Sequence, residues 1–238
     1  MKIVPIIPAL NPDEKLLNLV HELIDNGFKK IIIVNDGSRD DKIFKELSQN
    51  DECIILTHEV NKGKGSALKT AFRYYKENLQ DKYLGVVTLD ADGQHKVHDV
   101  LNIARLLEDN NMFILGTRLF NVKGTPWRNK LGNRITSSVF KKLYGVYLKD
   151  TQTGLRGIPN YLIELHLNTH GDRFEYEINA LIDLVKAYEK IIQVDIDTVY
   201  LNDSNKKSHF KVFNDSYQIY KILFKRRNRK WEKFFIFY

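Results

Sequence analysis

The chain has 238 residues, of which 43% are hydrophobic and 28% are charged, so it can bury one sizeable core. It contains no apolar run near the roughly 18 to 20 residues that cross a bilayer, and its first residues meet Pro and acid too early for a secretory signal. Its single cysteine, Cys53, excludes an internal disulfide and a zinc site built from cysteines. We therefore expect a cytoplasmic protein. The net charge of +7 arises near the C-terminus, because residues 205–238 hold ten Lys or Arg and only two acids.

Apolar runs and helical patterns alternate along the chain. In chain order we predict strand 2–7, helix 13–26, strand 31–34, helix 41–49, strand 53–57, helix 66–77, strand 84–89, helix 97–109, strand 112–115, helices 129–143 and 174–187, strand 192–200 and helix 215–227. Strands that lack clean polar alternation and are separated by helices are typical of a mostly parallel sheet with helices on both faces. The sequence thus predicts an α/β fold, whose ligands lie beyond the carboxyl ends of the strands.

Two carboxylates follow the predicted strand 84–89. Asp90 and Asp92 lie on one side of an extended chain, and Gln94 adds a third oxygen at the same spacing. Oxygen ligands of this kind favour Mg²⁺ or Mn²⁺, which completes its shell with phosphate oxygens and water. The alternative is an ordinary Asp-Ala-Asp-Gly turn at the end of a strand.

Further polar or charged residues lie at strand ends or in the helical segments that follow strands. Asp36 could accept a hydrogen bond from a nucleobase, or it could cap the next helix from an Asx turn. Lys64 lies beside glycine N–H groups at a helix start, which suits an anion, although His58 stands where a Walker A loop requires glycine. Arg118 and Arg134 could stabilise a pyrophosphate, or they could be surface and ion-pair residues.

In this order the clusters resemble the family 2 glycosyltransferases, and among them the branch of dolichyl-phosphate mannose synthase and undecaprenyl-phosphate glycosyltransferases. The matching stretches are IPALNPDE, VNDGSRD, HEVNKGKGSALKTAF, LDADGQH, LGTR, GNRITS, DTQTGLRG, RFEYEI and KSHF, from Ile7 to Phe210. One departure is Pro12, which stands where the family pattern has an acid, so either Asp13 or Glu14 could supply that contact.

The resemblance implies a GT-A fold, a UDP- or GDP-sugar donor and a divalent metal, within a catalytic domain spanning residues 1–212. It places Asp90, Asp92 and Gln94 at the metal and Arg118 and Arg134 at phosphates. The remaining implied substrate contacts are Pro8, Ala9, Asn11 and Asp36 at the nucleoside, Gln152 and Thr153 at the sugar, and Lys207, Ser208 and His209 over the diphosphate. We also expect Lys64 and Ala91 to be substrate-binding residues.

The acceptor decides which catalytic residues are needed. A polyprenyl phosphate is already ionised and can attack the anomeric carbon, with inversion, without a strong base. A sugar hydroxyl would instead need a carboxylate base, for which Glu175 and Glu177 are the candidates; on a helix only one of them can face the site.

The C-terminal segment, residues 213–238, mixes basic and aromatic residues. It could lie on an anionic membrane as a peripheral helix at the inner face of the cell membrane, or pack its apolar stripe on the domain. A non-enzymatic nucleic-acid-binding module would also use such a segment but leaves the strand-end carboxylates unexplained, so no nucleic-acid partner is expected. A sugar nucleotidyltransferase would have a glycine-rich loop after the first strand, where this chain has IPALNP.

Overall fold

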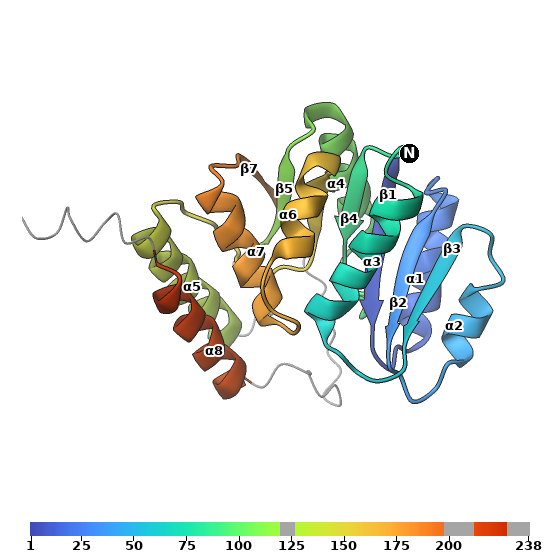
Figure 1. Cartoon of the computed structure of the whole chain (residues 1–238), viewed down its shortest axis with the longest axis horizontal. Helices are drawn as coiled ribbons and strands as arrows, with labels where there is room; N and C mark the ends of the chain where they lie inside the picture. Colours follow the sequence, from blue (N-terminus) through green and yellow to red (C-terminus); the bar gives the residue numbers. More distant parts are fainter. Residues whose placement is uncertain (120–126, 198–211, 228–238) are drawn as a thin grey trace, which may run out of the picture.

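The computed structural model describes residues 1–119, 127–197 and 212–227 (Figure 1). Its strands are β1 (Ile3–Ala9), β2 (Ile31–Asp36), β3 (Cys53–His58), β4 (Gly85–Thr88), β5 (Phe113–Arg118), β6 (Arg156–Pro159) and β7 (Ile191–Ile196). Its α-helices are α1 (Glu14–Asp25), α2 (Lys42–Leu47), α3 (Lys64–Asn78), α4 (Val97–Asn110), α5 (Trp127–Tyr144), α6 (Ile163–Asn168), α7 (Glu175–Lys186) and α8 (Val212–Lys225), and a 3₁₀ turn, η1 (Asn160–Leu162), precedes α6.

The strands form one sheet in the order β3-β2-β1-β4-β6-β5-β7. All neighbouring pairs are parallel except those of β6, which runs antiparallel to both β4 and β5. The predicted mostly parallel α/β sheet is confirmed. Parallel order places the carboxyl ends of β1, β2 and β4 side by side, and this edge carries the polar segments of the sequence.

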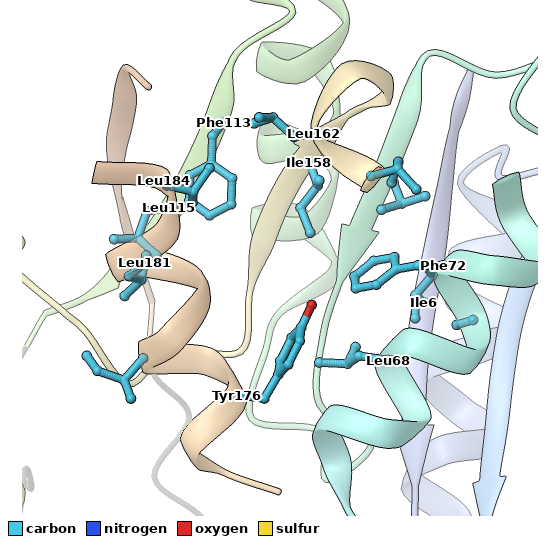
Figure 2. Packing of buried hydrophobic residues seen from close by; sticks show 14 of the residues in the cluster. Ile6, Leu68, Phe72, Phe113, Leu115, Ile158, Leu162, Tyr176, Leu181 and Leu184 are labelled. Carbon is cyan, nitrogen blue, oxygen red and sulfur yellow. The ribbon is translucent and has the colours of Figure 1, made fainter. Parts of the chain in front are cut away.

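Helices cover both faces of the sheet, because successive strand residues point to opposite sides. On β1, Ile3 and Ile7 pack with α1, α2 and α4, whereas Val4 and Ile6 pack on the opposite face with α3 and α5 to α8. Figure 2 shows the core on the face covered by α3 and α7, where Phe72 of α3 and Tyr176 of α7 are buried. Burial on both faces explains why the strands read as continuous apolar runs.

Three elements of the second half were not predicted: a strand, a 3₁₀ turn and a short helix. Strand β6 is short, contains Gly157 and ends at Pro159, a composition typical of a turn. Its place is set by pairing with distant strands, Val86 with Ile158 and Ile114 with Gly157, which no local pattern reveals. The following η1 and α6 were also missed. The predicted strand 192–200 is observed as β7, and residues 198–200 lie outside the described residues.

The last helix, α8, packs on the domain through its apolar stripe. Ile219 and Leu223 are buried against α5 and α7, and the Tyr144 hydroxyl donates to the Leu223 carbonyl at 2.9 Å. Arg226 donates to Asn179 Oδ1 at 2.7 Å and pairs with Asp183, both on α7. Residues 228–238 lie outside the described residues.

Within the part of the chain that the structure describes, none of the helices combines the length and the apolar character needed to span a bilayer.

Candidate active site

Asp36, at the end of β2, is the centre of a buried hydrogen-bond cluster. Its Oδ1 accepts from His58 Nδ1 at 2.7 Å and from the Lys62 N–H at 2.9 Å, and its Oδ2 accepts from the Gly63 N–H at 2.8 Å. His58 Nε2 lies 2.9 Å from Thr70 Oγ1. A carboxylate has about four acceptor positions, so three are used within the protein. Asp36 therefore shapes the loop before α3, and its predicted contact with a nucleobase stays a prediction.

Asn11 joins the loops that follow β1 and β2. It has a positive φ of 48°, its N–H donates to Ser38 Oγ at 2.8 Å, and its Oδ1 accepts from the Arg39 N–H at 2.8 Å. Pro8 and Ala9 end β1 directly beside Val34 and Asn35 of β2. The residues predicted to border the nucleoside thus lie together at one edge of the sheet.

Asp90, after β4, is held by two neighbouring side chains. Lys64 Nζ donates to its Oδ1 at 2.6 Å, and His95 Nε2 lies 3.3 Å from its Oδ2. Burial alone would raise the pKa of Asp90, but the Lys64 charge and the His95 hydrogen bond outweigh it and hold that pKa well below its usual range. Asp90 is therefore ionised and already neutralised in part by a protein cation.

The side chains of Asp92 and Gln94 make fewer contacts with the described residues than the side chain of Asp90 does. Asp92 Oδ1 accepts from the Gln94 N–H at 3.0 Å, while its Oδ2 makes no hydrogen bond or ion pair with the described residues, and the Gln94 side chain is exposed. Burial, followed by the nearby Asp90 charge, raises the pKa of Asp92. Ala91, between the two aspartates, is partly buried.

These oxygen donors fit a hard divalent cation that keeps several ligands from substrate and water. Asp92 and Gln94 keep the most acceptor positions for direct contact with such an ion, because each Asp90 oxygen already has one protein partner, Lys64 or His95. Asp90 as a third metal ligand stays a prediction. No cluster of three or more His, Cys, Asp or Glu side chains suited to a metal occurs among the described residues. The described residues therefore offer an incomplete shell, which phosphate oxygens can complete.

The two α7 carboxylates have different contacts. Glu177 Oε1 lies 2.9 Å from Lys64 Nζ, so Lys64 bridges Asp90 and Glu177. Glu175 instead accepts the N–H groups of Asp172 and Arg173, at 3.1 and 3.2 Å. As expected from helix geometry, only Glu177 of the two approaches the Asp90 cluster.

Arg118 and Asp150 form a paired group at the end of β5. Arg118 Nε and Nη2 donate to the two Asp150 oxygens at 2.6 and 3.1 Å, and Asp150 is fully buried. Asp150 Oδ1 also accepts the N–H of Gln152, which is partly buried. Arg134 is exposed on α5. The structure therefore orients Arg118 with a carboxylate, while the roles of both arginines toward phosphate stay predictions.

The segment from Thr151 to Gly154 passes next to Asp90. Thr153, predicted to face the sugar, is only 1% exposed, and its Oγ1 accepts from the Leu155 N–H at 3.2 Å, so it does not line an open site in this arrangement. Gly154 is the close neighbour, since a Cβ built there would lie 2.5 Å from Asp90 Oδ2. Lys207, Ser208 and His209 lie outside the described residues.

Several residues of the site were missed in the sequence. His95 follows the D-A-D-G-Q motif directly and Asp150 begins DTQTG, so both carried a positional signal. His58 was noted as a polar residue at a strand end and as a mismatch to Walker A, but not as a partner of Asp36. Arg156, buried on β6, donates to the carbonyls of Thr153 and Glu177, each at 3.0 Å, and had no signal because β6 itself was not predicted.

Solved structures of one bacterial synthase share this architecture. Glucosyl-3-phosphoglycerate synthase from Mycobacterium tuberculosis, in complex with phosphoglyceric acid, matches with a TM-score of 0.70 and 19% identity, over 95% of this chain and 80% of that one. The same synthase with Mg²⁺ and uridine diphosphate matches with a TM-score of 0.69 and 19% identity, over 95% and 79% of the two chains. The chain has the GT-A fold, as the sequence resemblance implied.

Sequence comparison gives the family. Residues 6–161 match the family described as Glycosyl transferase family 2. UDP-N-acetylglucosamine–dolichyl-phosphate N-acetylglucosaminyltransferase of Methanococcus voltae is 33% identical over 233 residues, covering 87% of this chain and 92% of the relative. Glycosyltransferase AglJ of Haloferax volcanii is 24% identical over 221 residues, covering 92% and 70%. The chain belongs to glycosyl transferase family 2 and is a glycosyltransferase. This finding decides against the two alternatives, a sugar nucleotidyltransferase and a non-enzymatic nucleic-acid-binding module.

Proposed function

We propose that the protein transfers a sugar, with inversion, from a nucleotide-diphosphate sugar to a polyprenyl phosphate, with Mg²⁺ or Mn²⁺ as cofactor. The M. voltae relative, 33% identical along most of both chains, is named for transfer from UDP-N-acetylglucosamine to dolichyl phosphate, which supports both substrate classes. The synthase neighbours contain Mn²⁺ or Mg²⁺ with uridine diphosphate, which supports the metal.

The choice of acceptor rests on one observation: both α7 carboxylates, Glu175 and Glu177, already have partners within the protein. Glu177 is paired with Lys64, and Glu175 accepts two backbone N–H groups, so neither is placed as an unengaged base. An acceptor phosphate oxygen is already ionised near neutral pH and needs no proton removed. The geometry thus favours a phosphate acceptor over a sugar hydroxyl.

In this mechanism the acceptor oxygen forms a bond to the anomeric carbon while the bond from that carbon to the donor phosphate breaks on the opposite face. Asp92 and Gln94 would hold the divalent ion, which offsets negative charge on the departing diphosphate. Lys64 and Arg118 contribute positive charge near the same edge of the sheet, and Asp150 orients Arg118.

Turnover with UDP-N-acetylglucosamine and a short-chain polyprenyl phosphate tests this proposal. We expect product with Mn²⁺ or Mg²⁺, loss of product with EDTA, and at least a hundredfold loss in Asp92→Asn, since charge stabilisation at such positions contributes about that factor. A series of GDP-sugars assayed in parallel tests whether the donor carries guanine instead of uracil. Transfer to a sugar hydroxyl but not to the lipid phosphate would contradict the proposed acceptor.

We propose further that the enzyme contacts an anionic membrane peripherally through the side-by-side helices α5 and α8 (Figure 1). No acid occurs between Arg118 and Asp150 in the sequence. Exposed apolar side chains lie among the basic residues of these helices. They are Ile135 on α5, Val146 and Tyr147 just after it, and Phe224 on α8. Ser138, Lys141, Lys142 and Tyr147 line a shallow depression of about 450 Å³. Basic groups mixed with exposed aromatic and aliphatic ones suit an anionic lipid surface.

A further inference from the structure

The Lys64 ammonium group lies between two carboxylates from different parts of the fold. It is 2.6 Å from Asp90 Oδ1, after β4, and 2.9 Å from Glu177 Oε1, on α7. Only 16% of the Lys64 side chain and 11% of the Glu177 side chain are exposed. An ammonium has three N–H donors, so one is left after these two contacts.

The backbone on both sides of this bridge is fixed independently. Asp36 holds the N–H groups of Lys62 and Gly63, directly before Lys64. On α7, the buried guanidinium of Arg156 holds the Glu177 carbonyl at 3.0 Å. The helices also approach closely at Gly65, where a Cβ would lie 2.6 Å from Tyr176 Cβ. Lys64 and Glu177 therefore meet in a prearranged geometry.

The charges of the cluster suit a single divalent ion. Asp90, Asp92 and Glu177 are three carboxylates, and Lys64 compensates one of their charges. Lys64 also takes one acceptor position of Asp90 Oδ1, so fewer Asp90 positions are open to a metal than on Asp92 and Gln94. Without Lys64, the three carboxylates would attract a cation more strongly than they do with it, even when no nucleotide-sugar donor is bound.

We propose that Lys64 is a positioning residue that sets the negative charge of the metal site. By holding Asp90 and Glu177, it keeps metal binding weak in the absence of nucleotide and makes it depend on the diphosphate of the donor. Glu177 is then the counter-carboxylate of Lys64 rather than a base. This inference rests on the proposed function, because it concerns the same metal and donor.

The test measures Mn²⁺ affinity, with and without UDP, for the full chain by calorimetry. Lys64→Met is expected to bind Mn²⁺ alone about tenfold more tightly and UDP at saturating Mn²⁺ about tenfold more weakly. Glu177→Gln is expected to bind Mn²⁺ alone more weakly, because it removes one negative charge. The double variant restores the original charge and is expected to approach the wild-type Mn²⁺ affinity.

Lys69→Met is the matched control, because Lys69 lies on the same helix and pairs with Asp172 at 3.3 Å outside the cluster. It should leave both affinities unchanged, and thermal unfolding of every variant identifies any that fails to fold. Lys64→Arg keeps the charge and should retain weak binding of Mn²⁺ alone. If Lys64→Met lowers or does not change Mn²⁺ affinity while the wild type binds Mn²⁺ and UDP, the inference is wrong and the proposed function stands. A wild type that binds neither overturns both.

Discussion

Gly154 brings the backbone of the 151–154 segment into contact with the Asp90 carboxylate. A Cβ at this position would lie 2.5 Å from Asp90 Oδ2 and 2.8 Å from its Cγ. The Asp90 side chain is short and is already held by Lys64 and His95, so it cannot move aside without losing these partners. The absence of a side chain at residue 154 is therefore a requirement of the site.

We predict that Gly154→Ala lowers the affinity for UDP with Mn²⁺ at least tenfold and costs about 1–3 kcal/mol of unfolding free energy, since extra volume in a packed region is destabilising. Calorimetry and denaturant unfolding measure the two effects. Gly132→Ala on α5 is the control, because nothing lies within 4 Å of its added Cβ. That change should stabilise by about 0.5–1 kcal/mol, as alanine does in helices. Unchanged nucleotide affinity in Gly154→Ala would contradict the prediction.

The sequence was enough to predict that several polar residues lie at one edge of the sheet, and the reason is geometric. Asp90, Asp92 and Gln94 follow a buried strand of a parallel sheet, where ligands bind, so their shared location follows from the alternation of strands and helices. Which partner each side chain takes depends on segments far apart in sequence. Lys64 with Glu177, and Arg118 with Asp150, are such pairs, and no local spacing predicts them.

At the scale of elements, Arg226 links the end of α8 to α7. Arg226 follows the last turn of α8 and contacts both Asn179 and Asp183, while Ile219 and Leu223 supply the apolar contact. Asn179 is fully buried, so its Oδ1 depends on this donor. The sequence left two possibilities for this helix, and the described part packs on the domain.

We predict that Arg226→Met destabilises the protein by about 1–3 kcal/mol, because it leaves a buried amide oxygen and a partly buried carboxylate without their charged donor. Lys225→Met, an exposed neighbour on the same helix, should change stability by less than about 0.5 kcal/mol. Urea unfolding compares the two variants. Equal effects would mean that the apolar stripe alone holds α8.

Regular elements were predicted well where their burial is uniform along their length. Strands buried on both faces and helices with one apolar stripe give strong local patterns, which is why β1 to β5 were found within a few residues of their ends. Strand β6 has four residues, including Gly157 and Pro159, and gains its regularity only from two distant partners. Its antiparallel direction was therefore beyond a local reading.

For the whole molecule, basic groups near α5 and α8 dominate the charge. The net charge is +7, and the region from Leu119 to Lys149 contains no acid. Lys141 and Lys142 are exposed beside Tyr147, and Lys141 Nζ lies 5.8 Å from the centre of that ring. The membrane contact that we propose would use this surface, and the range of its attraction to an anionic bilayer would be set by the ionic strength.

We predict that the protein sediments with phosphatidylglycerol vesicles but not with phosphatidylcholine vesicles, and that binding weakens as salt is raised from about 0.05 to 0.5 M. The paired change Lys141→Glu and Lys142→Glu should reduce vesicle binding at least tenfold, since each basic group near the surface contributes about 1 kcal/mol. Lys29→Glu with Lys82→Glu alters net charge equally at exposed positions outside these helices. If both pairs weaken binding equally, overall charge rather than this surface is responsible.

Strand β6 also has a consequence for how the protein is made. Among the described strands, β6 is the one that joins β4 to β5, so the sheet formed by β1 to β4, which is complete at Thr88, has an unpaired edge until Pro159 has been synthesised. A ribosome needs several seconds for that interval, during which the nascent chain exposes unpaired backbone groups of a buried strand. Chaperone dependence and aggregation during expression should therefore be decided in this interval, and stalling before β6 should be more harmful than stalling after it.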